Sequence, residues 1–340
     1  MRNRPVSAAS RIWEAIKSHG VSSSPSAPVP VNKNLMIEVP TTLVLGAGAS
    51  APYGFPTGRG LLKEVLERLD PKNQYPVNYE QQCGWLGFTD SQAIEFREVL
   101  LKSGKSSVDA FLEHRPEFIP IGKAAIALSL IPYEIEARLF EPRTGAWYEY
   151  LFTELNARRE DFGKNQVSVL TFNYDRSLEH YLSTALQNSY NLHSSECREM
   201  MKHIPIIHLH GDLGSPPYMG GRPFAPEFSK QSLEQAATGI RIIHEGFDGD
   251  EHFARARKIL QQSQKICFLG FGYDPTNIQR LGVHGGDISA RLMGSAYGLT
   301  RAESQRVRVR FQGQATHLEL GNEVQDVLAF LRNNPVLWGG

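Results

Sequence analysis

Cysteine is scarce in this chain, and the three cysteines that occur are far apart. Cys83, Cys197 and Cys267 form no C-x-x-C pair, so the sequence indicates neither a thiolate zinc site nor a disulfide framework. Such cysteine usage is typical of the reducing cytoplasm. The chain also lacks an apolar run near the roughly 18 residues that a membrane-spanning helix needs, and its N-terminus lacks the apolar core of a secretory signal. We therefore expect a cytoplasmic protein without a membrane partner.

Net charge is absent as well. Lys plus Arg and Asp plus Glu both number 36 in a chain of 340 residues. No overall positive field therefore exists that would hold the backbone of a nucleic acid or an anionic membrane. We expect no direct nucleic-acid partner.

The order of the predicted elements indicates one large domain preceded by a short segment. Residues 9–19 have a helical pattern, and a Ser/Pro-rich stretch follows them that is unable to form a core element. We assign residues 1–33 to this segment and 34–340 to the main domain. We expect the segment to act as an assembly arm, which makes a homo-oligomer the expected state.

The main domain begins with a strand, a glycine loop and a helix predicted at Gly58–Leu69. Mostly helical patterns then occupy about 70–160, and strand-like segments return after them, separated by helical stretches. These segments are VSVLTF, IPIIHLH, KICFLGF, RLMGSAYGL and THLEL. Such alternation is typical of a parallel sheet covered on both faces. We predict an α/β protein with a Rossmann-like parallel sheet, helices on both faces and a helical insert after the first βα unit.

The glycine loop predicts nucleotide binding. Gly46, Gly48 and Ala51 fill the pattern G-x-G-x-x-[G/A] between a predicted strand and a predicted helix. In this pattern the first glycine permits a tight turn, the second lets a phosphate approach, and the small third residue lets helix pack on strand. The pyrophosphate would then meet the N–H groups of a helix N-terminus. A tight turn without a ligand is the alternative.

The layout of an ordinary dehydrogenase is missing. Such an enzyme has an acidic residue at the end of a second strand, about 20 positions after the glycines. Glu64 and Glu67 lie near that distance but fall inside the predicted helix. The sequence therefore does not predict hydride transfer.

Polar residues follow the strand predicted at VSVLTF. Asn173 and Asp175 come where this strand ends, and ligands of open α/β sheets bind at the carboxyl ends of the strands. A structural alternative is that Asp175 caps a helix from Arg176 to Thr184 while Asn173 turns the chain.

Two histidines and two glycines follow other predicted strands. His208 and His210 are two apart, so a continuous strand would place both on one face. Either one is a candidate catalytic base or a structural histidine, and we predict no metal site because partner ligands are missing nearby. Gly270 and Gly272 follow KICFLGF and would leave space for a ligand, while Asp274 would cap the next helix.

Four short segments of the chain, in this order, resemble the motifs of the sirtuin superfamily. They are GAGAS at 46–50, Gly54-Phe55-Pro56, FNYD at 172–175 and LHG at 209–211. The resemblance covers roughly residues 40–335 and implies that NAD is bound. It implies that Asn173 positions a water or acceptor at the nicotinamide ribose and that His210 is the general base, with His208 as a rival. It implies that Gly46, Ala47, Gly48 and Ser50 cradle the phosphates and that Asp175 holds the nicotinamide amide. We expect further contacts with NAD from Pro56, Thr57, Gly270 and Gly272.

The chain also departs from the protein-deacylating sirtuins. It has no paired C-x-x-C elements of a zinc module, Thr57-Gly58-Arg59 replaces Asp-Phe-Arg, and Gly270-Phe271-Gly272 replaces Gly-Thr-Ser. The pattern is closer to the bacterial sirtuin-like NADases of antiphage defence. It implies hydrolysis of NAD, used as a substrate without a metal, to nicotinamide and ADP-ribose.

Depletion of NAD would harm the cell that carries the enzyme, so we expect regulation, with a second protein of a defence system as a candidate partner. Protein deacylation or ADP-ribosyl transfer is an alternative activity. A module that senses NAD or ADP-ribose without turnover is another, and a pocket blocked by Tyr174 or Phe271 would favour it.

Overall fold

A computed structural model describes residues 36–72, 79–227, 229–242, 250–283, 288–311 and 317–338. The assembly arm predicted at residues 1–33 lies outside them and stays a prediction. Within the described ranges, no helix combines the length and the apolar character needed to cross a bilayer.

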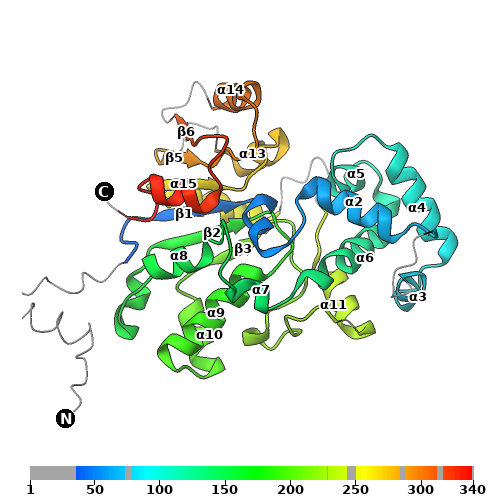
Figure 1. Cartoon of the computed structure of the whole chain (residues 1–340), viewed down its shortest axis with the longest axis horizontal. Helices are drawn as coiled ribbons and strands as arrows, with labels where there is room; N and C mark the ends of the chain where they lie inside the picture. The colour runs from blue at the N-terminus through cyan, green and yellow to red at the C-terminus, as the bar shows by residue number, and fades with distance from the viewer. Residues whose placement is uncertain are drawn as a thin grey trace, which may run out of the picture. The chain divides into compact units, whose positions relative to one another are not determined.

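A parallel sheet of six strands forms the centre of the described chain (Figure 1). The strands are β1 (Thr41–Leu45), β2 (Val167–Thr171), β3 (Ile206–His208), β4 (Lys265–Leu269), β5 (Arg291–Gly294) and β6 (Leu318–Leu320). Their order is β3-β2-β1-β4-β5-β6, and every neighbouring pair is parallel. The predicted α/β class and Rossmann-like sheet are confirmed, and each of the five predicted segments contains a strand.

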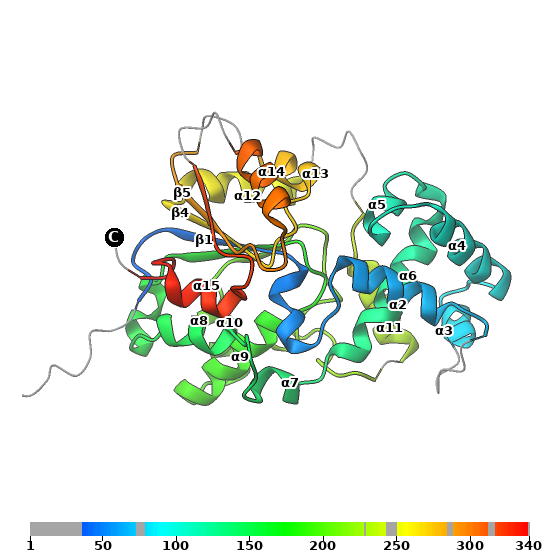
Figure 2. The ribbon, with the colours of Figure 1, turned by 45° about the horizontal axis from the view of Figure 1, so that its top comes forward.

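Alternate side chains of the strands pack into two cores, one on each face of the sheet. Leu43 and Leu45 of β1 belong to one core and Val44 to the other. Figure 2 shows α8, α9 and α10 below the sheet and α12, α13 and α14 above it. The helices on the two faces are α8 (Tyr148–Glu154), α9 (Ser177–Tyr190), α10 (Ser194–Met201), α12 (Glu251–Gln262), α13 (Pro275–Leu281), α14 (Arg301–Arg310) and α15 (Val327–Asn333).

The predicted helical insert is present between α2 (Gly58–Arg68) and β2. Its helices are α3 (Tyr79–Trp85), α4 (Asp90–Lys102), α5 (Val108–Leu112), α6 (Ile119–Leu130) and α7 (Ala137–Phe140). Helix α6 is apolar nearly all round and buried over most of its length, as expected of a helix surrounded by others. Helix α11 (Lys230–Gly239), which the sequence did not predict, packs against α6 although it follows β3. Figures 1 and 2 place this bundle beyond the carboxyl ends of the strands.

The strand order creates a switch point between β1 and β4. From β1 the chain adds β2 and β3 on one side, and β4 then starts the other half of the sheet. Open α/β sheets bind ligands at such a point, outside the carboxyl ends of the strands. The two glycine segments, after β1 and after β4, lie there.

Candidate functional site

The two glycine segments pack directly against each other. Gly46 N donates to Leu269 O at 3.0 Å, and Gly48 N donates to Gly270 O at 3.0 Å. A Cβ atom on Gly46 would lie 2.6 Å from Gly270 O, and one on Gly48 would lie 2.9 Å from it. Gly46 has an extended backbone rather than a strained turn. These glycines are therefore required by the contact between two loops, which the sequence pattern alone did not predict.

No α-helix begins directly at the glycine loop, so the N-terminus of an α-helix does not stand there to meet a pyrophosphate, contrary to the expectation. The loop continues as two short 3-10 turns, Ala47–Ala49 and Ala51–Tyr53, and α2 begins only at Gly58. Pro52 is the second residue of the second turn, and Gly54 has a φ of +95°. A proline and a left-handed glycine so close together prevent a continuous helix.

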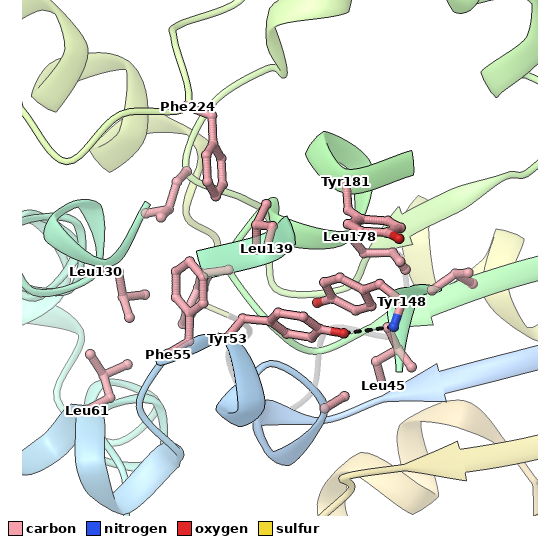
Figure 3. Close-up of a cluster of buried hydrophobic side chains, with 14 of the residues drawn as sticks. Leu45, Tyr53, Phe55, Leu61, Leu130, Leu139, Tyr148, Leu178, Tyr181 and Phe224 are labelled. Atoms are coloured by element: carbon pink, nitrogen blue, oxygen red, sulfur yellow. Dashed lines mark hydrogen bonds between the residues drawn. The ribbon is translucent and has the colours of Figure 1, made fainter. Parts of the chain in front are cut away.

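The last part of the insert anchors this loop. The Tyr53 hydroxyl accepts hydrogen bonds from Trp147 N at 2.8 Å and Tyr148 N at 2.7 Å, and Trp147 Nε1 donates to Ala49 O at 2.8 Å. The rings of Tyr53 and Tyr148 stack with centroids 3.8 Å apart (Figure 3). The sequence reading missed this anchor, although the aromatic run at 147–150 was a signal for a buried contact.

Asn173 joins the end of β2 to the glycine loop. Its Nδ2 donates to Gly46 O and to Ser50 Oγ, both at 3.0 Å, and its backbone N donates to Thr171 Oγ1 at 3.0 Å. The side chain is only 7% exposed. The two donors of the amide are thus committed to the loop, which leaves Oδ1 as the atom able to accept a hydrogen bond from a ligand.

Asp175 is buried behind Asn173. Its Oδ1 accepts from Ser177 N at 3.2 Å and from Ser177 Oγ, and Ser50 also hydrogen bonds to the carboxyl group. Burial raises the pKa of Asp175, while the hydrogen bonds from Ser177 and Ser50 oppose that rise. Ser177 is the first residue of α9, whose N-cap is Arg176, so Asp175 bonds to the start of the helix from one residue before the cap, whereas the structural alternative made it the cap itself.

A small cavity lies between these groups. It has a volume of about 10 Å³, and its lining includes Ser50, Asn173, Asp175 and Tyr148. That space suffices for about one water molecule. Asn173 and Asp175 are therefore brought together, but the space between them is far smaller than a nicotinamide ring.

The two histidines do not share a face, contrary to the sequence prediction. Strand β3 ends at His208, so the alternation does not extend to His210. His208 Nδ1 donates to Asn173 O at 2.8 Å, and Nε2 pairs with Glu179 of α9. Burial alone would lower the pKa of His208, but the Glu179 carboxylate raises it to about 9. His208 is thus a cation held by two acceptors, which makes it a poor catalytic base.

His210 lies instead against the insert. Its Nδ1 is 3.8 Å from Asp109 Oδ1 of α5, and its ring packs edge-on against Phe172 with centroids 5.3 Å apart. Its Nε2 is buried and has no hydrogen-bond partner among the described residues. Burial lowers the pKa of His210, and the Asp109 carboxylate partly opposes this. The lowered pKa favours the uncharged ring, and Nε2 is left free.

Helix α5 closes over this site. The Tyr174 hydroxyl donates to Asp109, and Arg280 Nη1 donates to Glu113 Oε1 at 2.9 Å. Phe271 packs on Phe172 with ring centroids 5.3 Å apart. Tyr174 and Phe271 are both buried; the centroids of the Tyr174 and His210 rings are 6.3 Å apart, and Phe172 contacts both Phe271 and His210.

The sequence also did not predict a cluster of buried charged side chains next to the site. Arg176 donates from Nε and Nη2 to Glu134, and Arg222 pairs with the same carboxylate. The remaining guanidinium hydrogens of Arg176 reach carbonyl oxygens of the segment 214–223. The cluster ties the segment after His210 to the start of α9. A sequence gives no signal for it because its three members are about 40 residues apart.

The other predicted residues lie further from this centre. Pro56 and Thr57 stand before α2, and neither forms a hydrogen bond with Asn173, Asp175 or His210. A Cβ atom on Gly272 would meet nothing within 4 Å, so open space adjoins it. Asp274 accepts from Thr276 N and Asn277 N and caps α13, as predicted.

The described residues contain no group of three His, Cys, Asp or Glu side chains placed to hold a metal ion. No protein-family model matches the chain, and no curated protein is significantly similar to it.

Proposed function

We propose that the protein hydrolyses NAD to nicotinamide and ADP-ribose at the edge formed by Asn173 and His210. The observation that carries this proposal is the pair of uncommitted polar atoms there: Oδ1 of a fixed Asn173, and the buried, unpartnered Nε2 of His210, whose lowered pKa favours the uncharged ring. Asn173 follows β2, the neighbour of β1 at the switch point, and His210 follows β3, the next strand outward; dinucleotides bind at such a switch point in folds of this kind.

The proposed reaction needs little from the protein. The bond between C1′ of the ribose and the pyridinium nitrogen breaks, its electron pair neutralises that nitrogen, and a water oxygen bonds to C1′. His210 accepts the proton that this water loses, and Asn173 Oδ1 orients the water. The transition state has oxocarbenium character, as in glycoside hydrolysis. The carboxylate of Asp109 near His210 then favours the protonated ring that results.

The dinucleotide fits only if the site opens. Open space beside Gly272 suits a ligand at the end of β4, but Tyr174, Phe271 and His210 are each less than a tenth exposed. The bond from Tyr174 to Asp109 and the pair of Arg280 with Glu113 would have to separate for α5 to move. An enzyme restrained until a second component opens it is consistent with the regulation that we expect.

The test is nicotinamide release from NAD by the full-length protein over a range of protein concentrations. Asn173→Ala and His210→Ala should each lower kcat by at least about a hundred-fold, the usual range for loss of a general base. Asn188→Ala and His317→Ala replace exposed residues of the same types and should leave the rate unchanged. Equal rates in all variants would overturn the proposal, and so would the absence of both nicotinamide release and saturable NAD binding.

A sensor that binds NAD without cleaving it is the second candidate, because Tyr174 and Phe271 are both buried close to the site. Calorimetry separates the two functions. Saturable NAD binding without nicotinamide release would favour the sensor. Deacylation or ADP-ribosyl transfer stays a prediction from the resemblance.

A further inference from the structure

A second site lies beside β3, the strand at one edge of the sheet. It is a groove of about 780 Å³ bounded by β3, the segment 211–222, α11 and α12. Small-molecule sites have volumes of about 300 to 1,000 Å³. None of the residues predicted to contact NAD lines this groove, and neither does Asn173 or His210. The groove is therefore distinct from the proposed catalytic edge.

The arginines of the groove differ in how many of their guanidinium donors have partners. Arg222 is fully engaged by Glu134 and Leu213 O. Arg241 has one ion pair, between Nη2 and Asp250 Oδ2 at 2.7 Å, while its Nη1 is buried without a hydrogen-bond partner in the described structure. A buried donor left unpaired costs free energy, so its position indicates that an acceptor is missing.

Further positively charged side chains lie near Arg241. Arg255 of α12 is exposed and has no hydrogen-bond or ion-pair partner within the described ranges. Burial lowers the pKa of Lys123 on α6, and the nearby positive charge of Arg241 lowers it further. The two acidic residues of the lining are already engaged, because Asp212 Oδ1 accepts from Gly214 N at 2.7 Å and Glu234 lies 3.9 Å from Lys230 Nζ. An anionic ligand would supply a partner for Arg255 and for Nη1 of Arg241.

The rest of the lining suits a polar molecule. Gln231, Gln235 and Thr238 of α11 and His252 of α12 border the groove and supply both donors and acceptors. Gly220 has a φ of +80°, and nothing lies within 4 Å of where its Cβ would be, so a ligand can approach the backbone there.

We propose that this groove binds a small molecule that carries a phosphate group, with Arg241 and Arg255 as the residues that hold the anion. A phosphate matches the geometry of a guanidinium with two parallel hydrogen bonds, and its double charge suits a region where Arg241, Arg255 and Lys123 are all positive. Arg241 N donates to His210 O at 2.8 Å, so the anion site is joined through one residue to the proposed catalytic histidine.

The test uses inorganic pyrophosphate as the probe and isothermal titration calorimetry of the full-length protein at 0.15 M salt. We expect saturable binding with one site per chain. Arg241→Gln and Arg255→Gln should each weaken the affinity at least about ten-fold, as expected for loss of a charge-assisted hydrogen bond. Arg308→Gln, at an exposed arginine of α14, is the matched control and should bind as the wild type does.

Asn173→Ala distinguishes this groove from the glycine loops and should leave pyrophosphate binding unchanged. Three results would overturn the proposal: no binding by the wild-type protein, wild-type affinity in both Arg241→Gln and Arg255→Gln, or loss of binding in Asn173→Ala alone. Arg255 is exposed, so its replacement does not threaten folding. Because the assay involves no NAD cleavage, its outcome is independent of the proposed enzyme activity.

Discussion

At the scale of single residues, His208 contributes to stability more clearly than to catalysis. Both of its ring nitrogens face oxygen acceptors, Asn173 O and the carboxylate of Glu179. Its pKa is therefore raised from the ordinary 6.5 to about 9 in the folded protein. The folded state binds the proton more tightly than the unfolded chain does, so stability depends on pH.

We predict that the free energy of unfolding falls as the pH rises through about 9. The contribution of His208 is fully present below pH 6.5, and the difference between the two pKa values is worth about 3 kcal/mol. Urea denaturation at several pH values measures it. In His208→Gln this part of the pH dependence should vanish, whereas His317→Gln, at an exposed histidine, should retain it. A wild-type stability that stays constant from pH 6.5 to 10 would contradict the prediction.

The sequence located some site residues and failed for others, for identifiable reasons. Asn173 and His210 were placed correctly at strand ends, because residues that follow parallel strands gather at one edge. The expectation for His208 and His210 failed because alternation holds only while a strand continues. The contacts of Arg176 with Glu134 and Arg222 depend on tertiary packing, which no local pattern reports.

At the scale of elements, the loops after β1 and β4 are held together by the close approach of their backbones. Gly270 has a φ of +56°, and a Cβ on it would lie 2.0 Å from Ala49 N. Gly272, two residues later, would meet nothing within 4 Å. Replacing each of these two glycines with alanine therefore tests how closely the two loops pack against each other.

We predict that Gly270→Ala lowers the free energy of unfolding by at least about 2 kcal/mol, since it adds a left-handed alanine to a backbone clash. Gly272→Ala should change it by less than about 0.5 kcal/mol. Urea denaturation measures both. Equal stabilities of the two variants would mean that the loops separate easily and do not form a fixed frame for the site.

Element prediction succeeded where the pattern was strong and local. The helix predicted at Gly58–Leu69 is α2, with its last residue differing by one, and the insert was recognised from its helical patterns. The amphipathic patterns of α10 and α11 are short and lie within polar sequence, so neither helix was predicted. Helix α9 extends to Tyr190, beyond the predicted Thr184, and ends at the left-handed Asn191, a common helix terminator.

At the scale of the whole molecule, we predict that residues 1–33 control assembly. Removing them should lower the mass measured by light scattering while far-UV circular dichroism shows a folded main domain. The apolar pattern of Ile12, Trp13 and Ile16 is the expected contact, so Trp13→Ala with Ile16→Ala should act like the deletion. Deleting only residues 22–30 of the Ser/Pro-rich stretch is the control. An unchanged mass after removal of residues 1–33 would refute the role of an assembly arm.

The position of β1 in the sheet affects how the chain folds during synthesis. Thr41 is aligned with Val167 on one side and with Lys265 on the other, so both neighbours of the first strand are made long after it. A nascent chain that ends before β4 leaves one edge of β1, an apolar strand, without a partner. Such edges pair with other chains, and contacts distant in sequence form slowly. Synthesis must therefore reach β4 before both edges of β1 are covered.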